Sequence, residues 1–190
     1  MIRNLICTVV FVGLCAGIST AQLSWDKRPT GIPIANPTAI QGSQEDVLKQ
    51  VKLLIDRNHI ALASDTRDED RGIEVMVTEP LVFARGIVAT SQVGHFAKVD
   101  GRLSTNLIQG RVTIRIEITP SSPTTSLVGV STKFEGLVQS AGQTWTTFPS
   151  RGHLEDRILK HLVMGVTGQA FDDVKADDMI LDPNTDGATP

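Results

Sequence analysis

The chain has 190 residues, a formal net charge of −3 at pH 7, two Trp and no Tyr. This mildly acidic balance contains no basic block and no alternation of basic and aromatic residues, so we expect no nucleic-acid surface. Both cysteines, Cys7 and Cys15, lie close to the N-terminus. The rest of the chain therefore cannot form a disulfide, a catalytic thiol or a thiolate metal site, and its core must hold it together.

The N-terminal residues have the parts of a secretory signal peptide. Arg3 precedes an apolar run at 5–18, and small residues lead up to Ala21. A bilayer span needs about 20 apolar residues, so we expect no membrane span, cleavage after Ala21, and export to the periplasm or envelope of a bacterial cell. The alternative is a lipid anchor at Cys15, but a bulky leucine directly before this cysteine matches a lipidation site poorly. Removing 21 of 190 residues leaves 169, enough for one domain with its own core.

An extended arm and a helix come next. Residues 22–42 are rich in proline and predict an extended, polyproline-like arm or a disordered N-terminus. Ser43 and Asp46 then form a capping-box pattern, and Asn58 is a good residue to end a helix. The apolar stripe that this helix would bury consists of Val47, Val51, Leu54 and Ile55.

Two hairpins follow from alternating patterns. Residues 60–78 read as two short strands around "DTRDEDRG", a turn too highly charged to be buried. The stretch 111–119, "RVTIRIEIT", alternates without exception and predicts an antiparallel strand with one solvent-facing side. A return strand at 126–136 completes this second hairpin. Residues 81–107 begin with a candidate strand at 82–88 and then become rich in Gly and Ser, which predicts a long excursion and a place to look for a binding surface.

The last helix is predicted after a cap at Ser150, within a single domain that spans 43–168. Its apolar side consists of Leu154, Ile158, Leu159, Leu162 and Val163, and its other side, expected to face solvent, of Arg151, Glu155, Asp156, Arg157 and Lys160. Residues 169–190 hold six Asp and one Lys, and we expect an acidic, disordered tail there.

Candidate catalytic groups do not converge. His153 and His161 lie eight residues apart, about 12 Å along a helix, which is too far for a shared metal ion. The adjacent Glu155 and Asp156 point in different directions. The segment around His95 holds a serine and an aspartate, Ser91 and Asp100, but no nucleophile elbow. We therefore expect no catalytic residue and no enzymatic activity.

Two further patterns suggest ion binding. The tail residues Asp182, Asn184, Asp186 and Gly187 match the first half of a calcium loop, but the second half, with its bidentate carboxylate, is missing. We expect no metal and no cofactor. On the second hairpin, the cations form either an anionic docking strip or cross-strand ion pairs with the acids of the same face, and ion pairing is the simpler interpretation. These residues are Arg111, Arg115, Lys133, Glu117 and Glu135.

The order of these elements resembles the BamC-like domains of the bacterial outer-membrane β-barrel assembly machinery. The resemblance rests on the capped helix "SQEDVLKQVKLLI", the strand pair around "DTRDEDRGI", the strand "RVTIRIEIT" and the helix start "FPSRGHLEDRIL", within about residues 43–165. It implies a helix-grip or TATA-binding-protein-like arrangement and a non-catalytic role in binding other proteins.

Pattern and resemblance together predict an α+β fold, with an antiparallel sheet of four or five strands and two helices on one face. The expected function is a non-enzymatic exported envelope module that binds a protein partner or supports assembly. The alternative is a carrier of a small molecule or lipid, with an apolar cavity between helix and sheet. Its mouth would be lined by Val82, Phe83, Phe96 and Trp145.

Overall fold

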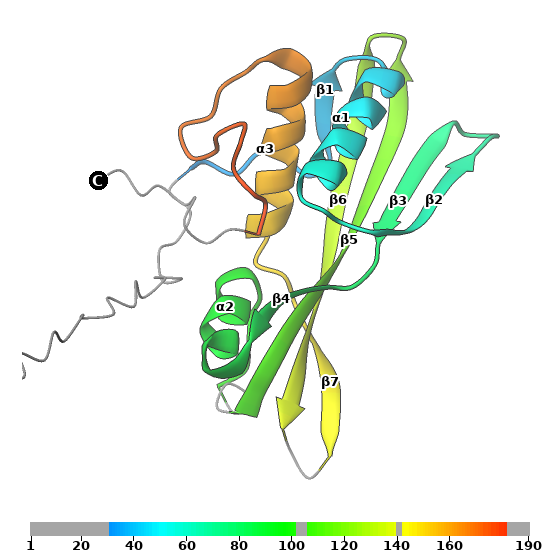
Figure 1. Ribbon diagram of the computed structural model, residues 1–190. Coiled ribbons are helices and arrows are strands. Elements are labelled where there is room, and N and C mark those ends of the chain that lie inside the picture. Colours follow the sequence, from blue (N-terminus) through cyan, green and yellow to red (C-terminus); the bar gives the residue numbers. More distant parts are fainter. Residues whose placement is uncertain (1–30, 102–105, 140–141, 182–190) are drawn as a thin grey trace, which may run out of the picture.

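The computed structural model describes residues 31–101, 106–139 and 142–181. A long antiparallel hairpin, β5 (Leu107–Ser122) and β6 (Thr125–Gln139), runs the length of the molecule (Figure 1). The alternation of "RVTIRIEIT" places its Val and Ile side chains on the buried face, where Val112, Ile114 and Ile118 are at most 1% exposed. The predicted second hairpin is therefore confirmed, and it is longer than the pattern indicated.

Five shorter strands extend this hairpin into a seven-stranded antiparallel sheet. They are β1 (Thr38–Gln41), β2 (Leu62–Asp68), β3 (Ile73–Thr78), β4 (Leu81–Arg85) and β7 (Gln143–Phe148). At one end of the hairpin the strand order is β1-β6-β5-β3-β2, whereas at the other end β4 pairs with β5 and β7 pairs with β6. Each long strand thus has different neighbours along its length.

The helices lie on one face of this sheet. α1 (Gln44–Arg57) and α3 (His153–Thr167) pack side by side over the β1–β3 end, and α2 (Ala89–Phe96) covers the β4 end after a 3-10 turn at Gly86–Val88 (Figure 1). Gly110 of β5 permits the close approach of α2, because a Cβ atom there would lie 2.2 Å from Cγ2 of Val93.

The expected fold class is wrong in its details. The sheet has seven strands rather than four or five, and the described residues form three α-helices rather than two, so the helix-grip arrangement does not apply. The additional strands come from segments with weak patterns: four residues after a proline-rich stretch form β1, and β7 is a short piece before Pro149. The candidate strand at 82–88 corresponds to β4, whereas the excursion predicted after it begins with a 3-10 turn and α2.

The predictions for α1 are confirmed. The Oγ atom of Ser43 accepts a hydrogen bond from the backbone N–H of Asp46 at 3.2 Å, and the Asp46 carboxylate accepts one from the Ser43 N–H at 3.3 Å. Asn58 ends the helix and donates its side-chain amide to the carbonyl of Leu54. All four residues of the predicted apolar stripe are buried.

Three aromatic rings fill the space between α2 and the sheet. Phe83 meets Phe96 and Phe134 edge-on, with ring centroids 5.7 and 5.9 Å apart, and Phe96 and Phe134 stack at 6.0 Å. Phe96 and Phe134 are fully buried. Aromatic contacts of this kind add to the burial energy, so this end of the sheet has a packed core of its own.

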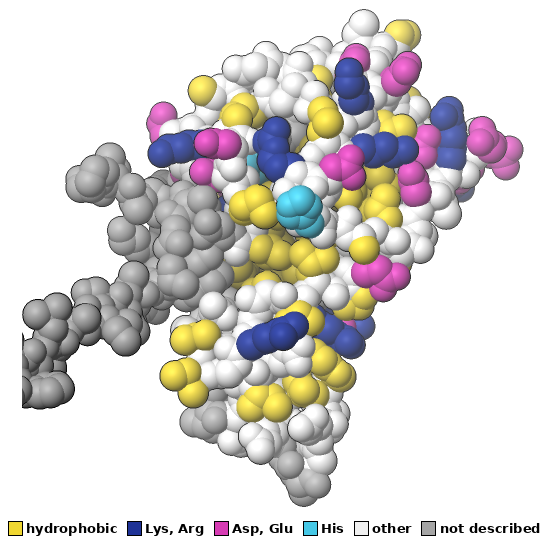
Figure 2. All heavy atoms as spheres, viewed as in Figure 1, with side chains coloured by type: hydrophobic (Ala, Val, Ile, Leu, Met, Phe, Trp, Pro, Cys, Tyr) yellow, Lys and Arg dark blue, Asp and Glu magenta, His cyan; other side chains and the backbone are white. Residues whose placement is uncertain are grey.

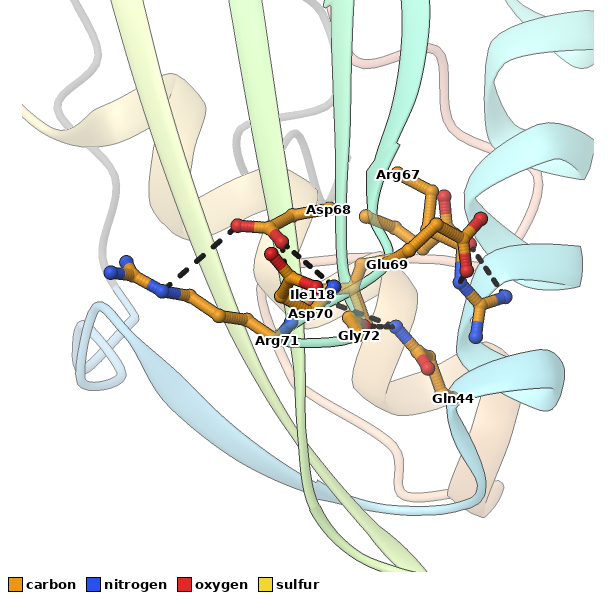
Figure 3. A network of polar contacts seen from close by, with 9 residues as sticks. Gln44, Arg67, Asp68, Glu69, Asp70, Arg71, Gly72 and Ile118 are labelled. Carbon is orange, nitrogen blue, oxygen red and sulfur yellow. Dashed lines mark hydrogen bonds and ion pairs between the residues drawn. The ribbon is translucent and has the colours of Figure 1, made fainter.

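The charged turn between β2 and β3 is exposed, as predicted, and is organised by its own charges (Figure 3). The carboxylate of Asp68 accepts the backbone N–H groups of Asp70 and Arg71 at 3.1 and 3.2 Å. Gln44, the first residue of α1, donates to the carbonyl of Gly72 at 2.5 Å and so ties the turn to the helix layer. The turn is therefore fixed in position although it is exposed to solvent.

The described part of the expected acidic tail differs from a disordered segment. Residues 169–181, which we call the C-terminal segment, pack against α1 and α3, and Ile180 is 2% exposed. The N–H of Ile180 donates to Oδ1 of Asn58 at 2.9 Å, and its carbonyl accepts from Arg157 at 3.1 Å. The predicted signal peptide with both cysteines, residues 22–30 of the proline-rich arm and the half calcium loop lie outside the described residues. The end of the predicted arm is not a free extension, because Thr38–Gln41 forms β1 of the sheet.

Candidate functional site

The face of the sheet opposite the described helices carries the candidate site, and we call it the helix-free face. Strict alternation along β5 and β6 puts every second residue there. On β5 these residues are Arg111, Thr113, Arg115, Glu117 and Thr119; on β6 they are Leu127, Gly129, Ser131, Lys133 and Glu135. The sequence pattern predicted this solvent-facing side, and the structure places it along the whole length of the hairpin.

Ion pairs fix the charged side chains of this face. Arg111 on β5 contacts the carboxylate of Glu135 on β6 at 3.0 Å, and Lys133 contacts the same carboxylate at 2.9 Å. Burial raises the pKa of Glu135, but the hydrogen bonds and charges of Lys133 and Arg111 outweigh this effect and hold the pKa below its usual range. Arg115 pairs with Glu117 of its own strand at 2.8 Å. Cross-strand ion pairing, the simpler interpretation of these charges, is confirmed for Arg111 and Glu135, whereas the other two pairs each lie within one strand.

Trp145 of β7 joins this network. The guanidinium carbon of Arg111 lies 3.9 Å from the centre of the indole ring, a cation–π contact. Arg111 is thus held both by the ring and by Glu135, and the indole is held in a fixed orientation on the helix-free face. Sequence reasoning missed this contact because it depends on the pairing of β6 with β7, which a six-residue strand does not reveal by itself.

A cleft of about 250 Å³ opens on the same face near β1. Asn36 and Pro37 form one wall, held by two hydrogen bonds between the Asn36 side chain and the backbone of Val130, at 2.6 and 3.1 Å. The floor includes Gly129 and the ion-paired Arg115. Leu127, which is 37% exposed, adds an apolar rim. The cleft therefore offers apolar surface, paired charges and backbone groups, a mixture suited to binding rather than to acid–base chemistry.

The histidines are arranged differently from the expectation. His153 and His161 do not form a site, as predicted, but His153 meets His95 from α2, with ring centroids 5.7 Å apart. Nδ1 of His153 lies 3.0 Å from the carbonyl oxygen of His95. These residues are 58 positions apart in sequence, so no spacing rule could pair them. Among the described residues, no group of three or more His, Cys, Asp or Glu side chains could hold a metal ion.

The serine candidate has a structural role. Ser91 donates its hydroxyl to the carbonyl of Val88, the N-cap residue of its own helix, at 2.9 Å. The predicted cap at Ser150 is corrected: the N-cap of α3 is Gly152, in a left-handed conformation with φ 87°. Ser150 instead donates to Glu155 at 2.9 Å, and Thr132 of β6 donates to the other oxygen at 2.6 Å. Glu155 therefore joins α3 to the sheet, and each of its carboxylate oxygens accepts a hydrogen bond.

The polar side of α3, expected to be solvated, is largely buried. Glu155, Arg157, Lys160 and His161 are all less than 9% exposed, and Lys160 is 1% exposed. The Nζ atom of Lys160 lies 2.8 Å from Asp156 and 2.7 Å from Asp173 of the C-terminal segment. Burial lowers the pKa of this ammonium, but the two carboxylates outweigh that effect and raise it above its usual value. The expectation was wrong for Arg157 and Lys160 because the C-terminal segment that contacts them was assumed to be disordered. Glu155 instead contacts Thr132 of the sheet and Ser150.

The four residues proposed as the mouth of a ligand cavity do not line one cavity together. Phe83 and Phe96 belong to the packed aromatic cluster under α2. Trp145 lies on the helix-free face with Arg111, and Val82, 38% exposed, is opposite Arg111 in the β4–β5 register. The helix side instead has an apolar hollow between the α1–α3 end and α2 (Figure 2). A cleft of about 280 Å³ is found there, lined by Asn58, Ile60, Leu81, Met179, Ile180 and Leu181.

Comparisons with known proteins return nothing for this chain: no family model, no curated protein and no solved structure matches it. Within the described residues, no helix is both long enough and apolar enough to span a bilayer. The role of the chain has therefore to be argued from its own surfaces.

We predict that Lys160→Met destabilises the protein strongly. The substitution keeps the length of the side chain but leaves Asp156 and Asp173 as uncompensated charges, which costs about 3–5 kcal/mol in unfolding free energy. Urea denaturation followed by circular dichroism measures this loss. The exposed Lys49 of α1 provides the control, since Lys49→Met should change stability by less than about 0.5 kcal/mol. Equal stabilities of the two variants would refute a structural role for the buried ammonium.

We also predict a pH dependence from His161. Burial, with the charges of Arg157 and Arg57, lowers its pKa to about 4 despite the nearby Asp178. Nε2 is buried and has no hydrogen-bond partner among the described residues. The imidazole takes up a proton near pH 6.5 in the unfolded chain but only near pH 4 in the folded chain. The contribution of His161 to the free energy of unfolding is therefore complete above pH 6.5, and it falls by up to about 3 kcal/mol as the pH decreases from 6.5 to 4.

Denaturation curves at several pH values from 7 down to 4.5 would check this slope. His161→Leu should flatten it, whereas His59→Asn, at an exposed histidine with φ 53°, should leave it unchanged. A slope that survives in His161→Leu would assign the effect to another group.

Proposed function

We propose that this chain is a non-enzymatic, exported module of the bacterial envelope that binds another protein through its helix-free face. The observation that carries the proposal is the composition of this face. A fixed Trp145–Arg111 pair, the exposed Leu127 and a cleft beside Pro37 lie along one open side of the β5–β6 hairpin. The signal-peptide pattern supports export, and the resemblance to BamC-like domains implies the same class of role.

The physical argument concerns the cost of binding. A side chain that becomes immobilised in a complex loses rotamer freedom, at about 0.5–1.5 kcal/mol each. Arg111 is already held by Glu135 and Trp145, so much of this cost is met during folding. Trp and Arg are also the residue types that most often dominate protein–protein binding energy. The face therefore offers a preorganised anchor with a polar surround.

The face also has apolar area beyond its anchor. Val75 and Val77 of β3 are opposite Glu117 and Arg115 in the strand register and are only partly buried. Leu127 lies across the hairpin from them, opposite Thr119. A mixture of single apolar side chains and paired charges is typical of non-obligate interfaces, which are about as apolar as the rest of a protein surface. We therefore infer a reversible partner rather than a permanent subunit.

Site-specific photo-cross-linking in cells that make the chain with its N-terminal leader tests this proposal. A photoreactive amino acid at Leu127 should give a discrete cross-linked product with another protein. The matched control is Leu53 on the exposed side of α1, which is 46% exposed against 37% for Leu127 and should give none. Trp145→Ala should reduce the yield at Leu127 several-fold. The proposal fails if Leu127 gives no product, or if the products appear at Leu53 instead.

A second candidate function, the carrier of a small apolar ligand, is supported by the cleft of about 280 Å³ beside the C-terminal segment. Five of its six lining residues are apolar, and the side chain of the sixth, Asn58, already bonds to Leu54 and Ile180. An occupant would thus be apolar and make few hydrogen bonds. Native mass spectrometry of the protein purified from the envelope should then show a bound small molecule that Leu81→Trp abolishes. A ligand-free mass would remove this candidate.

A further inference from the structure

Among the described residues, no strand pairs with the outer edge of β7. β7 pairs with β6 over six residues, from Phe134↔Phe148 to Gln139↔Gln143, and Figure 1 shows it at the margin of the sheet with no other strand beside it. One side of such a strand leaves backbone N–H and C=O groups without a sheet partner, and these groups are a template for another strand. The chemistry that satisfies them is an extended peptide backbone.

The other edge strands have features that oppose pairing with a further strand. β2 carries charged side chains along its exposed edge and a register shift between Leu62 and Ser64. β4 has a register shift between Val82 and Ala84, and β1 is only four residues long. Irregular register, charge and short length are the devices by which natural proteins protect sheet edges.

β7 has none of these devices. Its sequence, QTWTTF, contains no charged residue and no proline, and its register with β6 is regular throughout. On the neighbouring strands, the carboxylate of Glu135 contacts both Lys133 and Arg111, so this network carries one excess positive charge. These charges belong to β5 and β6, whereas β7 itself presents only uncharged side chains to an approaching strand.

We propose that β7 pairs antiparallel with β7 of a second copy of this chain. Antiparallel pairing of a strand with itself is symmetric, so a two-fold dimer satisfies both open edges at once and leaves no new edge exposed. An uncharged strand places no like charges opposite each other in any register, and its three threonines provide favourable Thr–Thr cross-strand pairs. Trp145 of each copy would lie over the joined strands on the helix-free side.

The size of the contact sets the strength of this dimer. Two strands of six residues bury less area than the roughly 1,200 Å² at which stable, specific interfaces begin. The dimer is therefore reversible and depends on concentration. It makes the two sheets, and the two helix-free faces, continuous through β6-β7-β7-β6. This inference is independent of the protein partner proposed above.

Sedimentation equilibrium of the mature chain between micromolar and near-millimolar concentration tests the dimer. We expect a reversible monomer–dimer equilibrium. Thr147→Lys and Thr144→Lys place a cation at exposed positions on opposite sides of β7 and should each raise the dissociation constant of the dimer by an order of magnitude or more. Thr66→Lys, at an exposed position on the β2 edge, is the matched control and should leave it unchanged. Circular dichroism verifies that each variant is folded.

Hydrogen exchange locates the contact. Amide protection at 143–148 should rise with protein concentration in the unchanged chain, while protection at 62–68 should stay constant. A chain that remains monomeric at all concentrations overturns the proposal. So does a dimer that gains no protection in β7, or one that forms equally well in both folded β7 variants.

Discussion

The pairing of β5 with β6 is the constraint on which the rest of the structure depends. Because the two strands are 16 and 15 residues long, one hairpin carries two separate groups of neighbours. Its buried face supplies the floor for α1 and α3 at one end and for α2 at the other, and its opposite face supplies the candidate binding surface. A shift of β5 by one residue in this register would turn the strand over and bury Arg111 and Arg115 in place of Val and Ile.

Much of the fold follows from local patterns in the sequence. The stripe from Val47 to Ile55, with the capping box at Ser43, specifies α1, and strict alternation specifies β5 and its solvent-facing side. These signals are local and periodic, so they can be recognised without knowledge of the tertiary contacts of each element. The ion pairs of Glu135 were predictable for the same reason, since the acid and both cations share one face of a predicted hairpin.

Other parts could not be predicted, because they depend on contacts between distant segments. The sequence pattern places Lys160 on the helix surface, and only the fold shows that Asp173 of the C-terminal segment contacts it. Similarly, Trp145 contacts Arg111 only because β7 pairs with β6. The contact between His95 and His153 likewise requires α2 and α3 to meet. The number of strands was underestimated because β1 and β7 are short and are stabilised by pairing with the long hairpin rather than by their own strand propensity.

The cluster around Lys160 also determines how the folded chain bears mechanical load. Asp156, which pairs with Lys160, accepts the backbone N–H of Ile34 at 2.7 Å, while Asp173 binds the same ammonium from the other end of the chain. Segments near both ends of the described chain are thus fastened to a single helix. A force that separates the two ends would act on this cluster, and on the bonds of Ile180 to Asn58 and Arg157, before it reached the long hairpin, so the sheet would keep its shape until these contacts broke.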